Sequence, residues 1–221
     1  MKTIWTEYEV SWEFLTKLCG SVPADPELVR AWLDAREPEA RPAGGRSIDE
    51  VQEEVMATLL EVEAAPSMLV FQRVGGVCVM RAATVRAHLK DCARVVSAQY
   101  VGKIQGERSF ATKVINGVYV EESRYWLPVL RPDGTPVEDA DGAYDKPVHA
   151  RGPRGQPLNS LKRFEWIEPA RLDFRLKVLG DSVKQRDLET LMTYGGVHGY
   201  AGERGDGEGK YRFRMTRVEA E

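Results

Sequence analysis

The sequence predicts an α+β fold built on a βαββαβ core, and three segments carry that prediction. Residues 6–18 alternate apolar and polar side chains and form a first strand, with one side made of Tyr8, Val10, Trp12 and Phe14. Residues 84–96 form a helix whose inward positions are Val85, Leu89, Cys92 and Val96. Residues 170–180 alternate again and form a late strand, with one side made of Leu172, Phe174, Leu176 and Val178.

Shorter patterns complete the core. Residues 68–71 and 77–80 are extended pieces joined by a turn at Gly75 and Gly76. Residues 160–168 are a further strand, residues 181–192 a final helix and residues 210–215 a last strand. With two insertions set aside, the order is βαββαβ, the ferredoxin-like plan. We expect a single domain over residues 1–221.

The two insertions differ in character. Residues 20–66 are acidic and predict two helices, one capped by Asp25 ahead of Pro26 and one begun by the capping box Ser47–Glu50. Residues 103–160 form a β-rich insertion. It contains a hairpin turning at Asn116-Gly117, a strand at 124–130, and a long loop over 131–159 that is rich in glycine, proline and charge.

Charge is unevenly distributed along the chain. The first 66 residues carry 6 Lys/Arg and 14 Asp/Glu, a formal charge of −8, and the remainder carries 25 and 20, a charge of +5. An acidic first third therefore accompanies a basic body, which the whole-chain charge of −3 conceals. The three cysteines lack metal-ligand spacing and fit buried, reduced thiols in a cytoplasmic protein. No run is long enough to span a bilayer, and we expect no cofactor and no metal site.

The tract from Tyr194 to Phe213 holds seven glycines, three of which are Gly199, Gly202 and Gly207. Such a run needs a reason, because glycine loses much conformational entropy on folding. Either its glycines permit turns, or they let the backbone approach another molecule. The basic residues Arg204 and Lys210 in the tract favour a backbone that cradles phosphates.

Other basic and aromatic residues lie in the helix entry (Arg81, Arg86, Lys90), in HARGPRG (Arg151, Arg154) and in LKRF (Lys162, Arg163). Basic grooves with aromatic platforms suit single-stranded nucleic acid. We expect Tyr200 to stack with bases, whereas Phe164, Trp166 and Phe213 fit strand cores better.

Catalytic motifs are scarce. The sequence has no HExxH, CxxC, GxSxG or GxxxxGK[ST] pattern. Of the three histidines, His198 and then His149 are candidates for a general base in RNA cleavage, since each lies among glycines and arginines.

The glycine tract, preceded by a helix and followed by a strand, resembles the C-terminal signature of the RAMP superfamily of CRISPR proteins. The segment VCVMRAATVRAHLKDCARVV resembles the strand, basic turn and first helix of that superfamily. The resemblance spans residues 66–215 and implies an RNA-recognition-type fold. It also implies a crRNA-binding role for the helix entry and a β-hairpin "thumb" for the second insertion. The glycine spacing is loose and the acidic insertion is unusual, so a phage or mobile-element relative fits equally.

From these features we predict a cytoplasmic protein that binds single-stranded nucleic acid, with RNA favoured over DNA, and has no catalysis of its own. It would act in a CRISPR-type ribonucleoprotein or a self-assembled complex, or as a phage relative in antiviral defence. Two alternatives stay open: a metal-independent endoribonuclease, and an inhibitor whose acidic surface binds a basic protein. The predicted binding residues are Arg81, Arg86, Lys90, Arg151, Arg154, Lys162, Arg163, Gly199, Tyr200, Gly202, Arg204 and Lys210.

Overall fold

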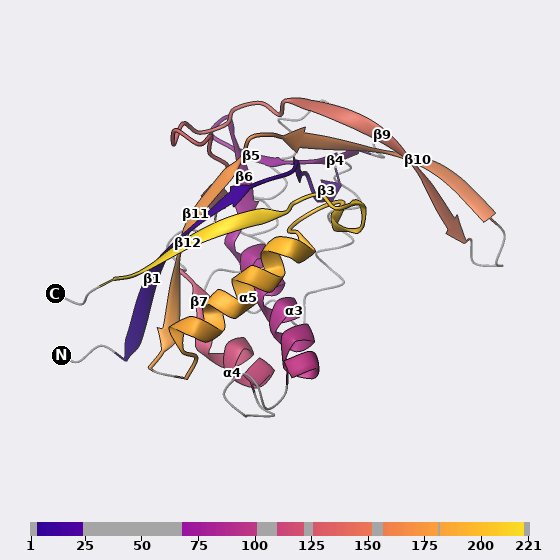
Figure 1. Cartoon of the computed structure of the whole chain (residues 1–221). Helices are drawn as coiled ribbons and strands as arrows, with labels where there is room; N and C mark the ends of the chain where they lie inside the picture. The colour runs from indigo at the N-terminus through magenta and orange to yellow at the C-terminus, as the bar shows by residue number, and fades with distance from the viewer. Residues whose placement is uncertain are drawn as a thin grey trace, which may run out of the picture. The chain divides into compact units, whose positions relative to one another are not determined.

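The computed structural model describes residues 4–23, 68–100, 110–121, 126–151, 157–180 and 182–218. It is an α+β protein (Figure 1), as the sequence predicts. The chain divides into two compact units, each made of separate segments. Unit 1 comprises Met1–Leu18, Val79–Val137 and Glu168–Glu221, and unit 2 comprises Cys19–Cys78 and Glu138–Ile167. The predicted acidic helices between residues 24 and 66 lie outside the described residues.

Unit 1 contains a four-stranded sheet in the order β12-β1-β11-β7, with every neighbouring pair antiparallel. Its strands are β1 (Trp5–Phe14), β7 (Val118–Val120), β11 (Arg171–Leu179) and β12 (Tyr211–Val218). The first, late and last strands predicted from the sequence are therefore confirmed.

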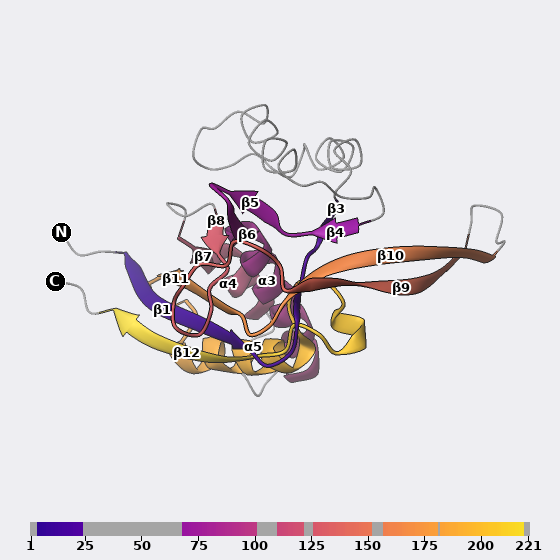
Figure 2. The ribbon, with the colours of Figure 1, turned by 90° about the horizontal axis from the view of Figure 1, so that it is seen from above.

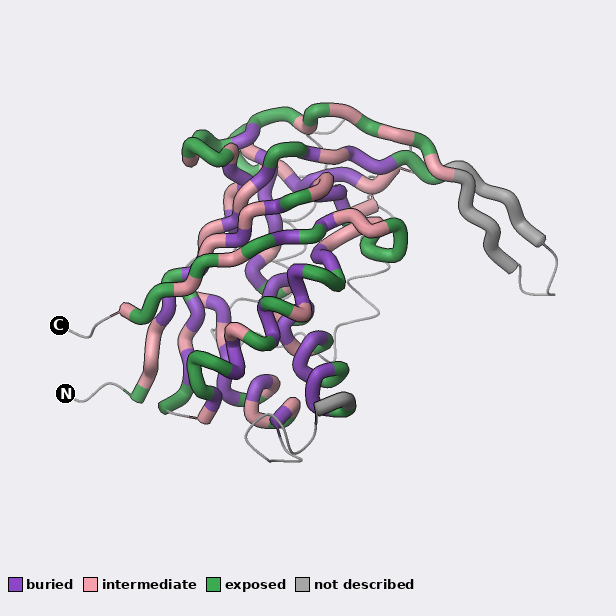
Figure 3. Tube along the Cα trace, viewed as in Figure 1, coloured by how far each residue is buried: buried purple, intermediate pink, exposed green. Residues whose placement is uncertain are grey.

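The alternation of apolar and mostly charged residues explains why β1 and β11 form strands here. On β1 the side chains of Tyr8, Val10, Trp12 and Phe14 are buried, and on β11 those of Leu172, Phe174, Leu176 and Val178 are buried. The residues between them are mostly charged and point to the other face, because successive side chains of a strand alternate. Figure 3 shows this alternation along both strands.

Helices α3 (Ala82–Tyr100) and α5 (Gln185–His198) pack against one another and on the apolar face of this sheet. His88 of α3 lies edge-on to Trp12, and Gly195 and Gly196 of α5 contact Tyr211. The predicted inward residues of α3 are all buried: Val85, Leu89, Cys92 and Val96. The chain order in unit 1 is β1, α3, β7, β11, α5, β12, with α4 (Phe110–Gly117) just before β7.

The hairpin predicted at Asn116-Gly117 is wrong, because residues 110–117 form helix α4. The buried positions Phe110, Val114 and Gly117 recur at helical spacing, so tertiary packing overrides the local turn signal of Asn-Gly. Gly117 packs tightly: a Cβ there would lie 2.6 Å from Oγ of Ser182. A short strand β8 (Trp126–Pro128) follows and pairs with Val79–Arg81 of β6 (Val77–Arg81).

Unit 2 is built around the antiparallel pair β9 (Gly142–Arg151) and β10 (Pro157–Ile167). The prediction of a long loop over 131–159 is thus wrong for residues 142–151 and 157–159, whereas residues 131–141 do form a loop. β4 (Met68–Val70) pairs in parallel with Arg163 and Phe164, and β3 (Val22–Pro23) pairs with β4. Beyond β4 the two long strands continue as a ribbon (Figure 2).

Three further short strands belong to these segments. β2 (Leu18–Cys19) leads out of unit 1, and β5 (Gln72–Val74) turns into β6 through Gly75 and Gly76. Both glycines have positive φ, 58° and 77°, as the predicted turn requires. Inside unit 2 the buried carboxylate of Glu165 accepts hydrogen bonds from the Phe71 N–H at 2.9 Å and Arg73 Nη2 at 3.1 Å. The cysteines Cys19, Cys78 and Cys92 are all buried and form no disulfide, and for Cys78 and Cys92 burial is as expected.

Candidate functional site

The first glycines of the tract are helical and serve close packing. Helix α5 runs to His198, six residues further than predicted, and so includes Gly195 and Gly196. A Cβ on Gly196 would lie 2.3 Å from the carbonyl oxygen of Tyr211, and one on Gly195 would meet the Tyr211 hydroxyl. These two glycines let α5 approach β12, which is a structural role.

The rest of the tract forms a compact loop, residues 199–210, which we call the glycine loop. Gly199, Gly207 and Gly209 have positive φ, at 85°, 86° and 71°. A Cβ on Gly209 would lie 2.0 Å from the carbonyl oxygen of Tyr200, and one on Gly199 would lie 2.4 Å from that of Glu208. The close approach that these glycines allow is therefore to the chain's own backbone.

The glycine loop is tied to the end of β1 by hydrogen bonds. The Glu208 carboxylate accepts the Lys17 N–H at 2.9 Å, and the Gly209 N–H donates to the Lys17 carbonyl at 2.9 Å. The Lys210 N–H donates to Oγ1 of Thr16 at 3.0 Å. Glu208 thus positions the loop. The Glu208 carboxylate is directed at the backbone of Lys17. The cations of the loop, Arg204 and Lys210, are both exposed.

Tyr200 does not lie where the stacking prediction requires. Its side chain is 1% exposed and packs edge-on to Trp12, at a centroid distance of 5.3 Å. Trp12 also stacks on Tyr211 at 4.2 Å. Burial raises the pKa of Tyr200, so the phenol stays neutral. The ring is part of the core, and no base can stack on it in this arrangement. Of the other aromatics, Phe164 is buried, as expected, and Trp166 and Phe213 are half-buried.

The same tyrosine joins the two motifs that the sequence singles out. Its hydroxyl lies 2.5 Å from Oγ1 of Thr84, in the first turn of α3. The helix entry and the start of the glycine loop are therefore adjacent in unit 1. Their separation of more than 100 residues in the sequence hides this contact.

The basic residues of α3 differ in what they contact. Arg86 donates through Nη2 to the Ile115 carbonyl at 3.1 Å and through Nε to the Val118 carbonyl at 3.3 Å, and lies over the Tyr119 ring. Its guanidinium is thus engaged by the end of α4. Arg81 lies 5.9 Å from the Trp126 ring centroid, and Lys90 is half-exposed.

Three side chains lie together at the C-terminal end of α5: the exposed His198 and Arg204 and the half-exposed Tyr194. His198 Nε2 lies 3.4 Å from Arg204 Nη1, and the imidazole stacks on Tyr194 at 5.5 Å. Partial burial and then the charge of Arg204 lower the pKa of His198, which favours the neutral imidazole. His88, one layer further in, is buried. Burial lowers its pKa to about 3 and leaves it neutral beside the Tyr211 hydroxyl at 3.1 Å.

The predicted binding residues of unit 2 are only partly described. Lys162 and Arg163 lie exposed on β10, and Arg163 makes a bidentate pair with Asp145 at 2.8 and 2.9 Å. The backbones of His149 and Arg151 lie on β9, with their side chains outside the described set. Arg154 lies outside the described residues. Gly202 lies in the glycine loop, half-exposed.

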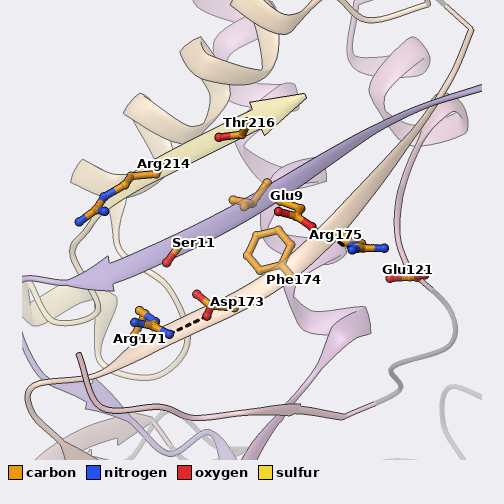
Figure 4. A pocket seen from close by; sticks show the side chains of 10 residues that line it. Glu9, Ser11, Glu121, Arg171, Asp173, Phe174, Arg175, Arg214 and Thr216 are labelled. Atoms are coloured by element: carbon orange, nitrogen blue, oxygen red, sulfur yellow. Dashed lines mark hydrogen bonds and ion pairs between the residues drawn. The ribbon is translucent and has the colours of Figure 1, made fainter. Parts of the chain in front are cut away.

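Sequence reasoning missed one feature, a hollow of about 630 Å³ on the charged face of the unit 1 sheet. Figure 4 shows that it lies over β1, β11 and β12, with guanidinium and carboxylate groups around it. The signal was present in the residues between the buried ones, which are Glu7, Glu9 and Glu13 on β1 and Arg171, Asp173, Arg175 and Lys177 on β11. A single strand cannot show that these rows lie side by side.

Comparison with known proteins adds little. No family model and no curated protein matches the chain. A chain in the cryo-EM structure of the Type III-B Cmr-beta bound to cognate target RNA is similar, with a TM-score of 0.46 and 8% sequence identity. The match covers 97% of this chain but only 61% of that one.

None of the described helices is both long and apolar enough to cross a membrane. No three His, Cys, Asp or Glu side chains gather as metal ligands would in the part of the chain that the structure describes.

Proposed function

We propose that unit 1 is a ferredoxin-like domain that binds single-stranded nucleic acid, RNA before DNA, along the helix entry and the glycine loop. The fold assignment is supported by the chain order βαββαβ together with the antiparallel sheet order β12-β1-β11-β7. In that order the first and third strands of the core are central, as two βαβ crossovers interleaved in one sheet require.

One observation carries the functional proposal: the Thr84–Tyr200 contact brings the basic start of α3 next to the basic glycine loop. Arg204 and Lys210 are exposed on the loop, and Arg81 and Lys90 are half-exposed on the helix side. Phosphate contacts by such residues provide affinity with little sequence preference. Arg86 and Tyr200 contribute to the framework of this surface instead of touching the ligand.

The resemblance of these two segments to RAMP proteins extends the proposal. We propose that the chain acts in a CRISPR-type ribonucleoprotein or as a phage-encoded relative, with protein partners as well as RNA. The β9–β10 ribbon, which carries Lys162 and Arg163, would add a second, sequence-independent contact.

The test is fluorescence anisotropy with labelled single-stranded RNA of about 30 nucleotides, beside matched DNA, at several salt concentrations. We expect tight binding that weakens steeply with salt. Arg204→Gln should weaken binding and reduce the salt slope by about 1, since one phosphate contact is lost. The matched control is Arg186→Gln, also an exposed arginine, which lies near the start of α5 and about 18 Å along the helix axis from His198. Equal affinity of the two variants, or no binding at low salt, would refute the proposal.

A second function has a specific observation in its favour. The exposed His198 is neutral at pH 7 and adjoins Arg204, so it can accept a proton while the guanidinium stabilises charge on a phosphate. A metal-independent endoribonuclease would cleave RNA in EDTA, and His198→Ala would lose cleavage but retain RNA binding. Intact RNA after incubation with the unmodified protein would exclude this activity.

A further inference from the structure

The hollow on the charged face of the sheet is separate from the proposed RNA surface. Tyr200 and α3 lie on the Trp12 face, whereas most of the residues that line the hollow are the alternate residues of the same strands, with Val10 and Phe174 as the exceptions. At about 630 Å³ it has the volume of a typical small-molecule site.

The charges around the hollow are paired unequally at its two sides. On the β12 side, Arg212 and Arg214 both bond to the single carboxylate of Glu13, at 2.7 Å each, which leaves one positive charge in excess. On the β7 side, Glu7 and Glu121 share the single ammonium of Lys177, at 3.8 and 3.9 Å, which leaves one negative charge in excess.

Between these sides the pairs are balanced. Arg175 bonds to Glu9 at 2.8 Å, and Arg171 bonds to Asp173 at 2.9 Å (Figure 4). Ser11 lies in register between Arg214 and Asp173 and adds a hydroxyl beside the positive side. A ligand that complements this surface therefore has an anionic group at one end and N–H donors at the other.

The distance across the sheet limits the size of that ligand. From β12 to β7 there are three interstrand spacings, about 14 Å between backbones. Arg214 is in register with Ser11 and Asp173, whereas Glu121 lies beside Arg175, two residues further along β11. The two side chains therefore lie diagonally across the hollow, and a ligand that reaches both is an extended molecule about the length of one nucleotide. Guanidinium groups match phosphate, and a carboxylate accepts from the adjacent N1–H and N2–H donors of guanine.

We propose that this hollow is a nucleotide site: Arg214 and Ser11 bind the phosphate, and Glu121 binds the N–H edge of a guanine base. The nucleotide comes either free or within a strand, since both present the same phosphate and base. Arg214 suits the phosphate because its side chain is 79% exposed. Among the described residues its guanidinium bonds to one carboxylate, that of Glu13, through Nη2.

Isothermal titration calorimetry tests the site with GMP, UMP and guanosine, and with a trinucleotide that has a central guanine. We expect GMP to bind more tightly than UMP or guanosine. Arg214→Gln should weaken GMP at least tenfold, and Glu121→Gln should remove the preference over UMP. The control is Arg217→Gln, an exposed arginine of the same strand whose register with Tyr8 places it on the opposite face.

A free nucleotide and a nucleotide within a strand would give different results in this experiment. If GMP binds and Arg214→Gln weakens it, the site takes a free nucleotide. If GMP does not bind but Arg214→Gln weakens the trinucleotide, the site takes a nucleotide within a strand. If neither ligand binds saturably, or Arg214→Gln and Arg217→Gln behave alike, the inference is overturned. The glycine-loop surface is tested by Arg204→Gln in the RNA anisotropy assay and the hollow by Arg214→Gln in calorimetry, so the failure of one proposal can be told from the failure of the other.

Discussion

Substituting alanine for Gly196 tests whether the glycines of α5 exist for packing. In an ordinary helix, Gly→Ala is stabilising by about 1 kcal/mol, because alanine loses less conformational entropy. Here the new Cβ would lie 2.3 Å from the carbonyl oxygen of Tyr211, a backbone atom of a paired strand. Relief needs a displacement of about 1 Å, and such overpacking costs about 3 kcal/mol, at the upper end of its usual range.

The net expectation for Gly196→Ala is therefore a loss of about 2 kcal/mol in unfolding free energy, the opposite sign from a free helix. For a chain of this size, that is a fall in Tm of about 4–8 °C. Gly205→Ala is the control, since a Cβ there has nothing within 4 Å. Thermal unfolding followed by circular dichroism measures both. If Gly196→Ala were as stable as the unmodified protein, the packing explanation would be refuted.

Three further changes test the interior of unit 1. In the folded protein His88 has a pKa of about 3 and is neutral. In the unfolded chain the same side chain binds a proton below about pH 6.5. The free energy of unfolding should therefore fall by about 1.4 kcal/mol for each pH unit between about pH 6.5 and pH 4. His88→Gln should flatten that slope in urea titrations, and parallel slopes would contradict this. Tyr200→Phe leaves Thr84 without its buried partner and should cost about 1 kcal/mol, with RNA affinity little changed because the ring touches no base; a large affinity loss at unchanged stability would restore the stacking role. Glu208→Gln keeps an acceptor for the Lys17 N–H but removes a charge-assisted bond, and should cost about 1 kcal/mol and speed proteolysis of the glycine loop. Unchanged cleavage kinetics would show that Glu208 does not hold the loop.

The elements that the sequence predicted correctly carry their own periodicity. β1 and β11 alternate over nine or more residues, and α3 repeats apolar residues every three or four positions. Such patterns need no knowledge of the partner, because any sheet or helix layer must cover the apolar side. The α+β class followed from them, whereas the strand β7 of the unit 1 sheet lies inside the segment that the sequence assigned to an insertion.

The predictions that were wrong concern segments whose structure depends on residues far away in the sequence. Asn116-Gly117 ends a helix because Phe110 and Val114 find a core to enter. Residues 142–151 and 157–159 of the supposed loop belong to a strand pair, since each strand is stabilised by hydrogen bonds to the other. The candidate site shows the same limit: Tyr200 looked like an exposed loop aromatic, but it is buried against Trp12, almost 190 positions away in the sequence.

By itself, then, the sequence determined the fold class, the main strands and helices, and the concentration of basic residues at the helix entry and the glycine tract. Only the tertiary structure decided which glycines pack against the chain's own backbone and which cations stay exposed. It also brought Thr84 to Tyr200 and placed the charged rows of β1, β11 and β12 side by side around a hollow. The physical reason is that periodicity is a local property of the chain. Burial, charge pairing and close backbone approach depend on which distant segments become neighbours.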